Sequence, residues 1–241
     1  MPKRFMWLVA ALLAEPCHAS EELITTAHKK DGETIPYVLN AAGPAPRYVV
    51  ILFPGGSGNM DPRMQNGKLI YGFKGNFVIR TRKLLVDGEF ATVATNASQS
   101  EERIQAILDD LKTRYPAAQV YLMSTSKGTL DSMRLAGYLS DKIAGEIHTS
   151  SMNSVHNFDA RNYKNRHLLV HHRHDDCHAT PFRSAQHSHD KYGTELLAMD
   201  GGTSTGDVCE PFAHHGYNGI EKETITAIKQ WIKQAPAATP R

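Results

Sequence analysis

A serine-containing turn near the middle of the chain has the residue types of a nucleophile site. Residues 124–128 read STSKG and differ only in their first position from the pattern G-x-S-x-G. In that pattern the central serine stands on a sharp turn between a strand and a helix, and small residues two places before and after it keep the turn free of clashes. Ser124 and Gly128 are both small. The spacing therefore predicts that Ser126 is a nucleophile.

Two later segments contain the acid and the base that a nucleophilic serine needs. The segment HHRHDDC follows an apolar run and has two adjacent carboxylates, and FAHHGY near the C-terminus has two adjacent histidines. The histidine must accept the proton of the serine hydroxyl, and the carboxylate must orient the imidazole and stabilise its charged form. We expect Asp175 rather than Asp176 to be the acid, and His215 rather than His214 to be the base.

A glycine-rich segment, FPGGSG at 53–58, offers backbone amides for a negatively charged intermediate. An oxyanion hole beside a serine elbow uses the amide of the residue after the nucleophile and a second amide from a loop at another strand end. We assign these roles to Lys127 and Gly56. Alternatively, the glycines only turn the chain or cradle a phosphate, but the Lys-Ser/Thr ending of a phosphate loop is missing here.

These residues need a scaffold that brings several strand ends together. Short apolar runs alternate with amphipathic stretches, which is typical of parallel strands joined by helices. The pattern predicts a central, mostly parallel sheet with helices on both faces. Strands are expected at 37–39, 48–53, 90–94, 119–123, 145–149, 167–171 and 194–199, and helices at 76–86, 101–111, 127–139 and 220–231.

The segments FPGGSG, NFVIR, STSKG, HHRHDDC and HHGYNGIE together resemble the minimal α/β-hydrolases found as exported, largely uncharacterised bacterial proteins. The resemblance covers nearly all of the chain after residue 19. It implies the α/β-hydrolase fold without a large cap domain, with Asp175 as the acid, His215 as the base and a disulfide between Cys177 and Cys209. Ser124 departs from the family, in which a glycine is more usual.

The N-terminal residues of the chain predict export. Residues 1–19 combine a basic start, an apolar run and small final residues, the layout of a secretory signal peptide. The apolar run is too short for a membrane anchor. One domain is expected over 20–234, followed by a flexible tail at 235–241. In the periplasm or outside the cell, the two remaining thiols, Cys177 and Cys209, are expected to form a disulfide.

The sequence thus predicts a carboxylesterase-like serine hydrolase that forms an acyl-enzyme on Ser126 and needs no cofactor or metal. An amidase or peptidase with the same triad is the first alternative. A metal-dependent hydrolase using the histidine-rich segment and a non-catalytic binding protein are further alternatives. The formal net charge of +2 indicates no nucleic-acid partner. The short connection 153–166 predicts an open cleft for a small-molecule or polymer ester, lined by Phe158, Tyr163 and Phe182.

Overall fold

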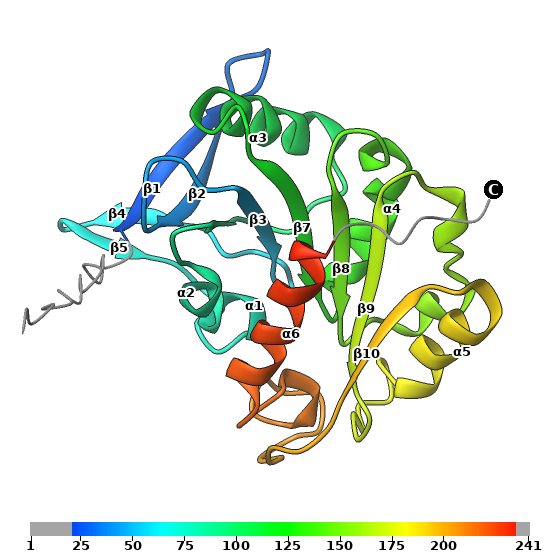
Figure 1. The fold of residues 1–241 in the computed structure, drawn as a ribbon. Coiled ribbons are helices and arrows are strands. Elements are labelled where there is room, and N and C mark those ends of the chain that lie inside the picture. Colours follow the sequence, from blue (N-terminus) through cyan, green and yellow to red (C-terminus); the bar gives the residue numbers. More distant parts are fainter. Residues whose placement is uncertain (1–20, 235–241) are drawn as a thin grey trace, which may run out of the picture.

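The computed structural model describes residues 21–234, so the predicted signal peptide and tail lie outside the described residues. Eight strands form one sheet in the order β1-β2-β6-β3-β7-β8-β9-β10 (Figure 1). Their bounds are β1 Glu21–His28, β2 Thr34–Ala41, β3 Tyr48–Phe53, β6 Phe90–Ala94, β7 Gln119–Thr125, β8 Gly145–Thr149, β9 Arg166–His172 and β10 Glu195–Met199. A separate small hairpin joins β4 Arg63–Gln65 to β5 Lys68–Ile70.

The sheet is parallel from β6 to β10, and β2 pairs antiparallel with both β1 and β6. This confirms the predicted class, an α/β protein with a central, mostly parallel sheet. Parallel strands place their carboxyl ends at one edge of a sheet, so the loops after β3, β7 and β9 open on the same side. That edge is where the chemistry-bearing segments meet.

Helices cover both faces of the sheet (Figure 1). Their bounds are α1 Phe77–Arg80, α2 Arg82–Leu85, α3 Glu101–Arg114, α4 Gly128–Leu139, α5 Phe182–Tyr192 and α6 Glu221–Lys233. The packing of β3 on both faces of the sheet explains why its sequence is apolar throughout. Val49, Ile51 and Phe53 pack in the core under α3 and α4, whereas Val50 and Leu52 pack in the core under α1, α2 and α6. Each strand residue is buried on one face or the other.

Helix α3 begins at Glu101, where its sequence predicts, and extends beyond the predicted end at residue 111 to Arg114. The Ser100 side chain accepts a hydrogen bond from the amide of Arg103 at 3.2 Å, and Glu101 and Glu102 lie in the first turn near the positive end of the helix dipole. Ile104, Ile107 and other apolar residues on one face are buried. The N-terminal cap and the hydrophobic spacing favour a helix over the same residues, and both stabilise α3.

The segment 76–86 differs from its prediction as one helix. It forms two short helices, α1 and α2, that meet at Thr81. The Thr81 hydroxyl donates a hydrogen bond to the carbonyl of Phe77 at 2.6 Å, and the buried Arg82 side chain donates to the carbonyl of Ile79 at 2.7 Å. The carbonyl of Phe77 also accepts the amide of Thr81 at 3.0 Å, so α1 closes at Thr81, and the Arg82 side chain satisfies the carbonyl of Ile79 instead of a following helical turn.

The connection between β8 and β9 holds only two 3-10 turns, η1 Asn153–Asn157 and η2 Ala160–Asn162. No large cap domain is therefore inserted into residues 21–234. Within the same residues, no helix has the length and apolar character needed to cross a membrane.

Candidate active site

Ser126 stands on a sharp turn between β7 and α4, with a backbone φ of 51°. This left-handed conformation is unusual for a residue with a Cβ atom and is found at strained functional sites. The amide of Ser126 donates to the carbonyl of Thr149 at 3.0 Å, and its carbonyl accepts from the amide and the hydroxyl of Thr129 at 2.9 and 2.6 Å. Hydrogen bonds on both sides therefore hold the turn.

The residues around Ser126 are small because other backbone passes close by. A Cβ atom on Gly128 would lie 2.5 Å from the carbonyl oxygen of Pro54, and one on Gly55 would lie 2.9 Å from the Cβ of Ser126. Ser124, at the position where the resembled family more often has glycine, is fully buried. Its hydroxyl lies 2.7 Å from that of Ser132 on α4, so the serine fits without clash.

The loop after β3 brings its glycines to the same turn. Gly56 is exposed and has a φ of 63°, and a Cβ atom there would lie 2.8 Å from the ring of Phe73. Neither the Gly56 amide nor the Lys127 amide donates a hydrogen bond to another residue in 21–234. Both amides are thus free to bind an anionic oxygen.

Asp175 and His215 form a buried hydrogen-bonded pair at the same edge of the sheet. Their exposed fractions are 6% and 7%. The Nδ1 of His215 lies 3.1 Å from Asp175 Oδ2, and Asp175 Oδ1 accepts from the amide of Cys177 at 3.1 Å. With a proton on Nδ1 facing the carboxylate, the Nε2 of His215 is left as the proton acceptor.

Thr180 is a third member of this cluster that the sequence did not reveal. Its hydroxyl donates to Asp175 Oδ2 at 3.0 Å and lies 3.0 Å from His215 Nδ1. Thr180 is fully buried. A lone threonine in a loop belongs to no motif, and only the fold shows that it contacts both the acid and the base.

The neighbouring acid and histidine lie elsewhere. Asp176 is exposed, in contrast to the buried Asp175. His214 stacks on His172 with ring centres 4.4 Å apart, and its Nδ1 lies 3.2 Å from the carbonyl of His174. Of the two residue pairs that the sequence offered, the structure therefore brings Asp175 and His215 together.

Hydrogen bonds from Ser150, Tyr217 and Arg80 fix the loop that contains His215, the histidine loop. The Ser150 hydroxyl donates to the carbonyl of His215 at 2.6 Å. The Tyr217 hydroxyl accepts from the Ser150 amide at 2.9 Å and donates to the carbonyl of Val170 at 2.7 Å. From another side, Arg80 donates to the carbonyl of Gly216 at 2.6 Å. The guanidinium is thus engaged with the protein backbone and is not free for a substrate anion.

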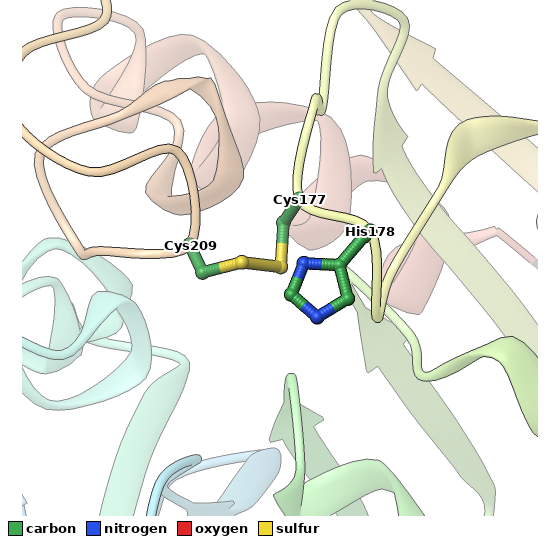
Figure 2. Close-up of side chains that lie close together, drawn as sticks. All are labelled: Cys177, His178 and Cys209. Carbon is green, nitrogen blue, oxygen red and sulfur yellow. A yellow bond between two sulfur atoms is a disulfide. The ribbon is translucent and has the colours of Figure 1, made fainter.

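A disulfide joins Cys177, two residues after Asp175, to Cys209 in the loop that precedes His215 (Figure 2). The exposed His178 lies beside it (Figure 2). The bonded sulfurs are not available as thiolate ligands, which weakens the alternative of a metal site in the histidine-rich segment.

His172 of that segment is also accounted for by hydrogen bonds within the fold, whereas neither ring nitrogen of His171 makes a hydrogen bond within residues 21–234. His172 Nε2 lies 2.8 Å from the carbonyl of Gly201, and its Nδ1 accepts from the amide of His174 at 3.0 Å. His171 is fully buried with its Nδ1 4.0 Å from Asp175 Oδ2. Burial lowers the pKa of His171, and the nearby Asp175 partly opposes this shift.

Two of the three aromatic residues expected to line the cleft are placed differently. Phe158 is buried, contacts the ring of Tyr163 and packs with Val155 and Leu169 in the core beside α5. This expectation was wrong for Phe158 and Tyr163, because the connection 153–166 folds back onto the sheet. Aromatic surface near the site comes instead from Phe73 at Gly56 and from Phe212, whose exposed fraction is 51%.

Comparisons with known proteins agree on the fold. No protein-family model and no curated protein matches the sequence. Solved structures do match: an α/β serine hydrolase without lid from Xanthomonas campestris has a TM-score of 0.58 and 12% identity, over 92% of this chain and all of that one. An esterase domain from Rhodothermus marinus has a TM-score of 0.60 and 11% identity, over 88% of this chain and 97% of that one.

A longer protein, the acylaminoacyl peptidase of Pyrococcus horikoshii, matches 92% of this chain over 43% of its own length, with a TM-score of 0.56 and 13% identity. At such identities the likeness concerns the fold. The chain has the α/β-hydrolase fold, as its motifs predicted.

Proposed function

We propose that this protein is a serine hydrolase that cleaves carboxylic esters through an acyl-enzyme on Ser126. The observation that carries the proposal is the buried Asp175–His215 pair, which lies at the same sheet edge as a serine held at a φ of 51°. Nucleophile, acid and base follow one another along the chain in the order usual for this fold.

The reaction begins with attack of the Ser126 hydroxyl oxygen on the ester carbonyl. Nε2 of His215 takes the hydroxyl proton, and Asp175 stabilises the resulting imidazolium through Nδ1. The amides of Gly56 and Lys127 bind the oxyanion of the tetrahedral intermediate. His215 then gives its proton to the leaving alcohol, and the acyl group stays on Ser126.

The second half of the reaction repeats these roles with water. His215 removes a proton from the water that attacks the acyl-enzyme, and the same two amides bind the second oxyanion. When the intermediate collapses, His215 returns a proton to Ser126 and the carboxylic acid leaves. Neither half requires a cofactor.

The substrate class follows from the surroundings of the site. The connection between β8 and β9 forms only short turns, and Phe212 is half exposed beside the histidine loop. An uncapped edge with aromatic surface favours accessible esters with short acyl chains, or ester groups on a polymer, over long lipids held in a tunnel. The disulfide supports export to an oxidising compartment.

Labelling with a fluorophosphonate probe tests the mechanism, with p-nitrophenyl acetate turnover as the second readout. Label and turnover should vanish in Ser126→Ala and persist in Ser124→Ala, a matched change two residues away. Asp176→Asn and His214→Gln are expected to stay active, whereas Asp175→Asn and His215→Gln lose most turnover. An unlabelled wild-type protein would refute the assignment.

Amide or peptide cleavage is the second candidate, because the same triad performs it when the leaving amine is protonated. The match to an acylaminoacyl peptidase favours testing it. Paired p-nitrophenyl ester and p-nitroanilide substrates with the same acyl group separate the two activities. A larger kcat/KM for the anilide would replace esters by amides as the substrate class.

A further inference from the structure

Three metal-ligand side chains meet inside the protein, away from Ser126. Glu146 and His148 lie two residues apart on β8 and therefore point to the same face of the sheet, and Glu146 pairs directly with His167 on β9. Their exposed fractions are 0%, 0% and 3%. One ligand atom from each lies within 4.8 Å of the others.

The hydrogen bonds of the cluster fix which histidine nitrogens face inward. Asn165 donates through Nδ2 to Glu146 Oε1 at 3.5 Å, so its Oδ1 is the acceptor for Nε2 of His167 at 3.1 Å. That contact leaves Nδ1 of His167 with a lone pair. On the other side, Nδ1 of His148 lies 3.1 Å from the Ser132 hydroxyl, which turns Nε2 of His148 inward.

The two inward nitrogens have the spacing of metal ligands. Nε2 of His148 and Nδ1 of His167 are 3.3 Å apart and form a hydrogen bond that a bound ion would replace. Two nitrogens bound to one tetrahedral zinc ion at about 2.0–2.1 Å lie about 3.3–3.4 Å from each other. Each ring also has a polar partner at its outward nitrogen, as metal-bound histidines almost always do.

The third ligand, Glu146, has one carboxylate oxygen that is not hydrogen-bonded within the described part of the chain. Among residues 21–234, Glu146 Oε2 is buried and has no hydrogen-bond partner. A buried carboxylate oxygen in this state costs free energy, and most such groups in proteins have a partner. A cation beside Oε2 would remove this cost.

We propose that Glu146, His148 and His167 bind a zinc ion that stabilises the fold at the start of β8 and β9. The ligands are Oε2 of Glu146, Nε2 of His148 and Nδ1 of His167, with water as the fourth ligand. Two neutral imidazoles and one carboxylate form a donor set that zinc favours.

The site is distinct from the proposed catalytic centre. Glu146 and His167 lie near the amino ends of β8 and β9 and His148 lies inside β8, whereas Ser126 follows the carboxyl end of β7. The Ser132 hydroxyl that contacts His148 also contacts Ser124, so the cluster ends two residues before the nucleophile. Zinc is therefore expected to act on stability and not on the chemical step.

Metal analysis of the full chain, purified after expression with zinc, is the direct test. We expect about one zinc ion per chain in the wild type. Glu146→Gln and His167→Gln should lose it. His156→Ala is the matched control, because His156 and His187 form a stacked histidine pair, with ring centres 3.6 Å apart, that could hold zinc adventitiously. Loss of the zinc in this control, or its retention in Glu146→Gln, would overturn the proposal.

Two measurements on the wild type keep the test independent of variant folding. After removal of metal with dipicolinate, zinc at about a thousand times its Kd should raise Tm by about 10 °C. Cobalt should give the intense visible bands of a four-coordinate ion. An unchanged Tm, or an infrared band of a protonated Glu146 in zinc-treated protein, would contradict the site. Fluorophosphonate labelling of the stripped protein tests the hydrolase separately.

Discussion

Thr180 places a hydroxyl between the acid and the base, 3.0 Å from Asp175 Oδ2 and 3.0 Å from His215 Nδ1. It limits the orientations available to both side chains. Because Asp175 also accepts from the amide of Cys177, the carboxylate is held at both oxygens. In the proposed mechanism, Thr180 is a positioning residue that does not contact the substrate.

Thr180→Val should therefore lower kcat about tenfold, the effect of losing about 1.4 kcal/mol of hydrogen-bond stabilisation, with little change in KM. Thr180→Ser keeps the hydroxyl and should restore most of the rate. Steady-state kinetics on a p-nitrophenyl ester measure both constants. Equal kcat values for Thr180→Val and the wild type would show that the hydroxyl has no positioning role.

Because His171 is buried, we expect it to make the free energy of unfolding depend on pH in the acidic range. Its pKa lies below the usual value because it is buried, so below about pH 6.5 the unfolded chain binds a proton that the folded protein does not. Stability from this group is complete above pH 6.5 and is lost as the pH falls toward the lowered pKa. His171→Leu should make the decline shallower by up to about 1.4 kcal/mol per pH unit.

Urea unfolding at several pH values between 5 and 8 measures this slope. His28→Leu, at an exposed histidine on the edge strand β1, is the matched control and should leave the slope unchanged. Identical slopes for His171→Leu and the wild type would assign the acid sensitivity to other buried histidines.

The residues of the site differ in how far sequence reasoning could find them. Ser126, Asp175 and His215 stand in local motifs whose order along the chain is informative. Thr180 and Ser150 stand in no motif, and the motif that contains Tyr217 does not show its hydrogen bond with Ser150, because these roles depend on contacts between loops far apart in sequence. The set Glu146, His148 and His167 was missed for a similar reason, since it arises only when β8 and β9 are paired in register.

At the scale of elements, the turn at Ser126 depends on close packing between α4 and the loop after β3. Gly128→Ala would place a Cβ atom 2.5 Å from the carbonyl oxygen of Pro54. Because that atom belongs to the backbone, relief needs a shift of the loop or the helix. We expect a loss of about 2–3 kcal/mol in the free energy of unfolding.

Gly137→Ala is the control in the same helix, because a Cβ atom there meets nothing within 4 Å. That change should stabilise the protein by about 0.5–1 kcal/mol through helix propensity. Chemical denaturation of both variants gives the comparison. If both alanines had the same effect, the close approach at Gly128 would not govern the turn.

Elements with strong apolar patterns were predicted, and those without them were missed. Runs such as YVVILF and FATVA are buried on both faces and read as central strands. Helix α5 was missed because its buried side is built from Ser184, Ala185 and Ser188, so hydrophobic spacing is nearly absent. Strand β1 was missed because it lies at the sheet edge, where alternating partly exposed residues give a weak signal.

At the scale of the whole molecule, the proposed catalytic residues and the proposed zinc ligands lie in different parts of the parallel sheet. Its carboxyl edge gathers the loops with the proposed catalytic residues, and the proposed zinc ligands lie within the paired strands β8 and β9. The disulfide belongs to the catalytic edge, where it joins the acid loop to the loop before His215. Stability and activity are therefore coupled at that edge.

Replacing both bonded cysteines by serine should cost about 3–4 kcal/mol, because the bond closes a loop between residues 32 positions apart. Turnover should also fall, since Cys177 donates its amide to Asp175. Denaturation and kinetics of Cys177→Ser/Cys209→Ser, beside wild type treated with a reductant, measure both effects. Undiminished turnover in a folded, reduced protein would show that the bond has no catalytic role.

The position of Cys209 also decides what happens when the chain is cut. Residues 201–208, between β10 and the cysteine, are all exposed and rich in small and polar side chains, which makes them a target for proteases. A nick there leaves the C-terminal fragment, with His215 and α6, covalently attached through Cys209 to Cys177. The nicked protein would migrate as one species on a denaturing gel until it is reduced, and cleavage would not release the histidine from its acid.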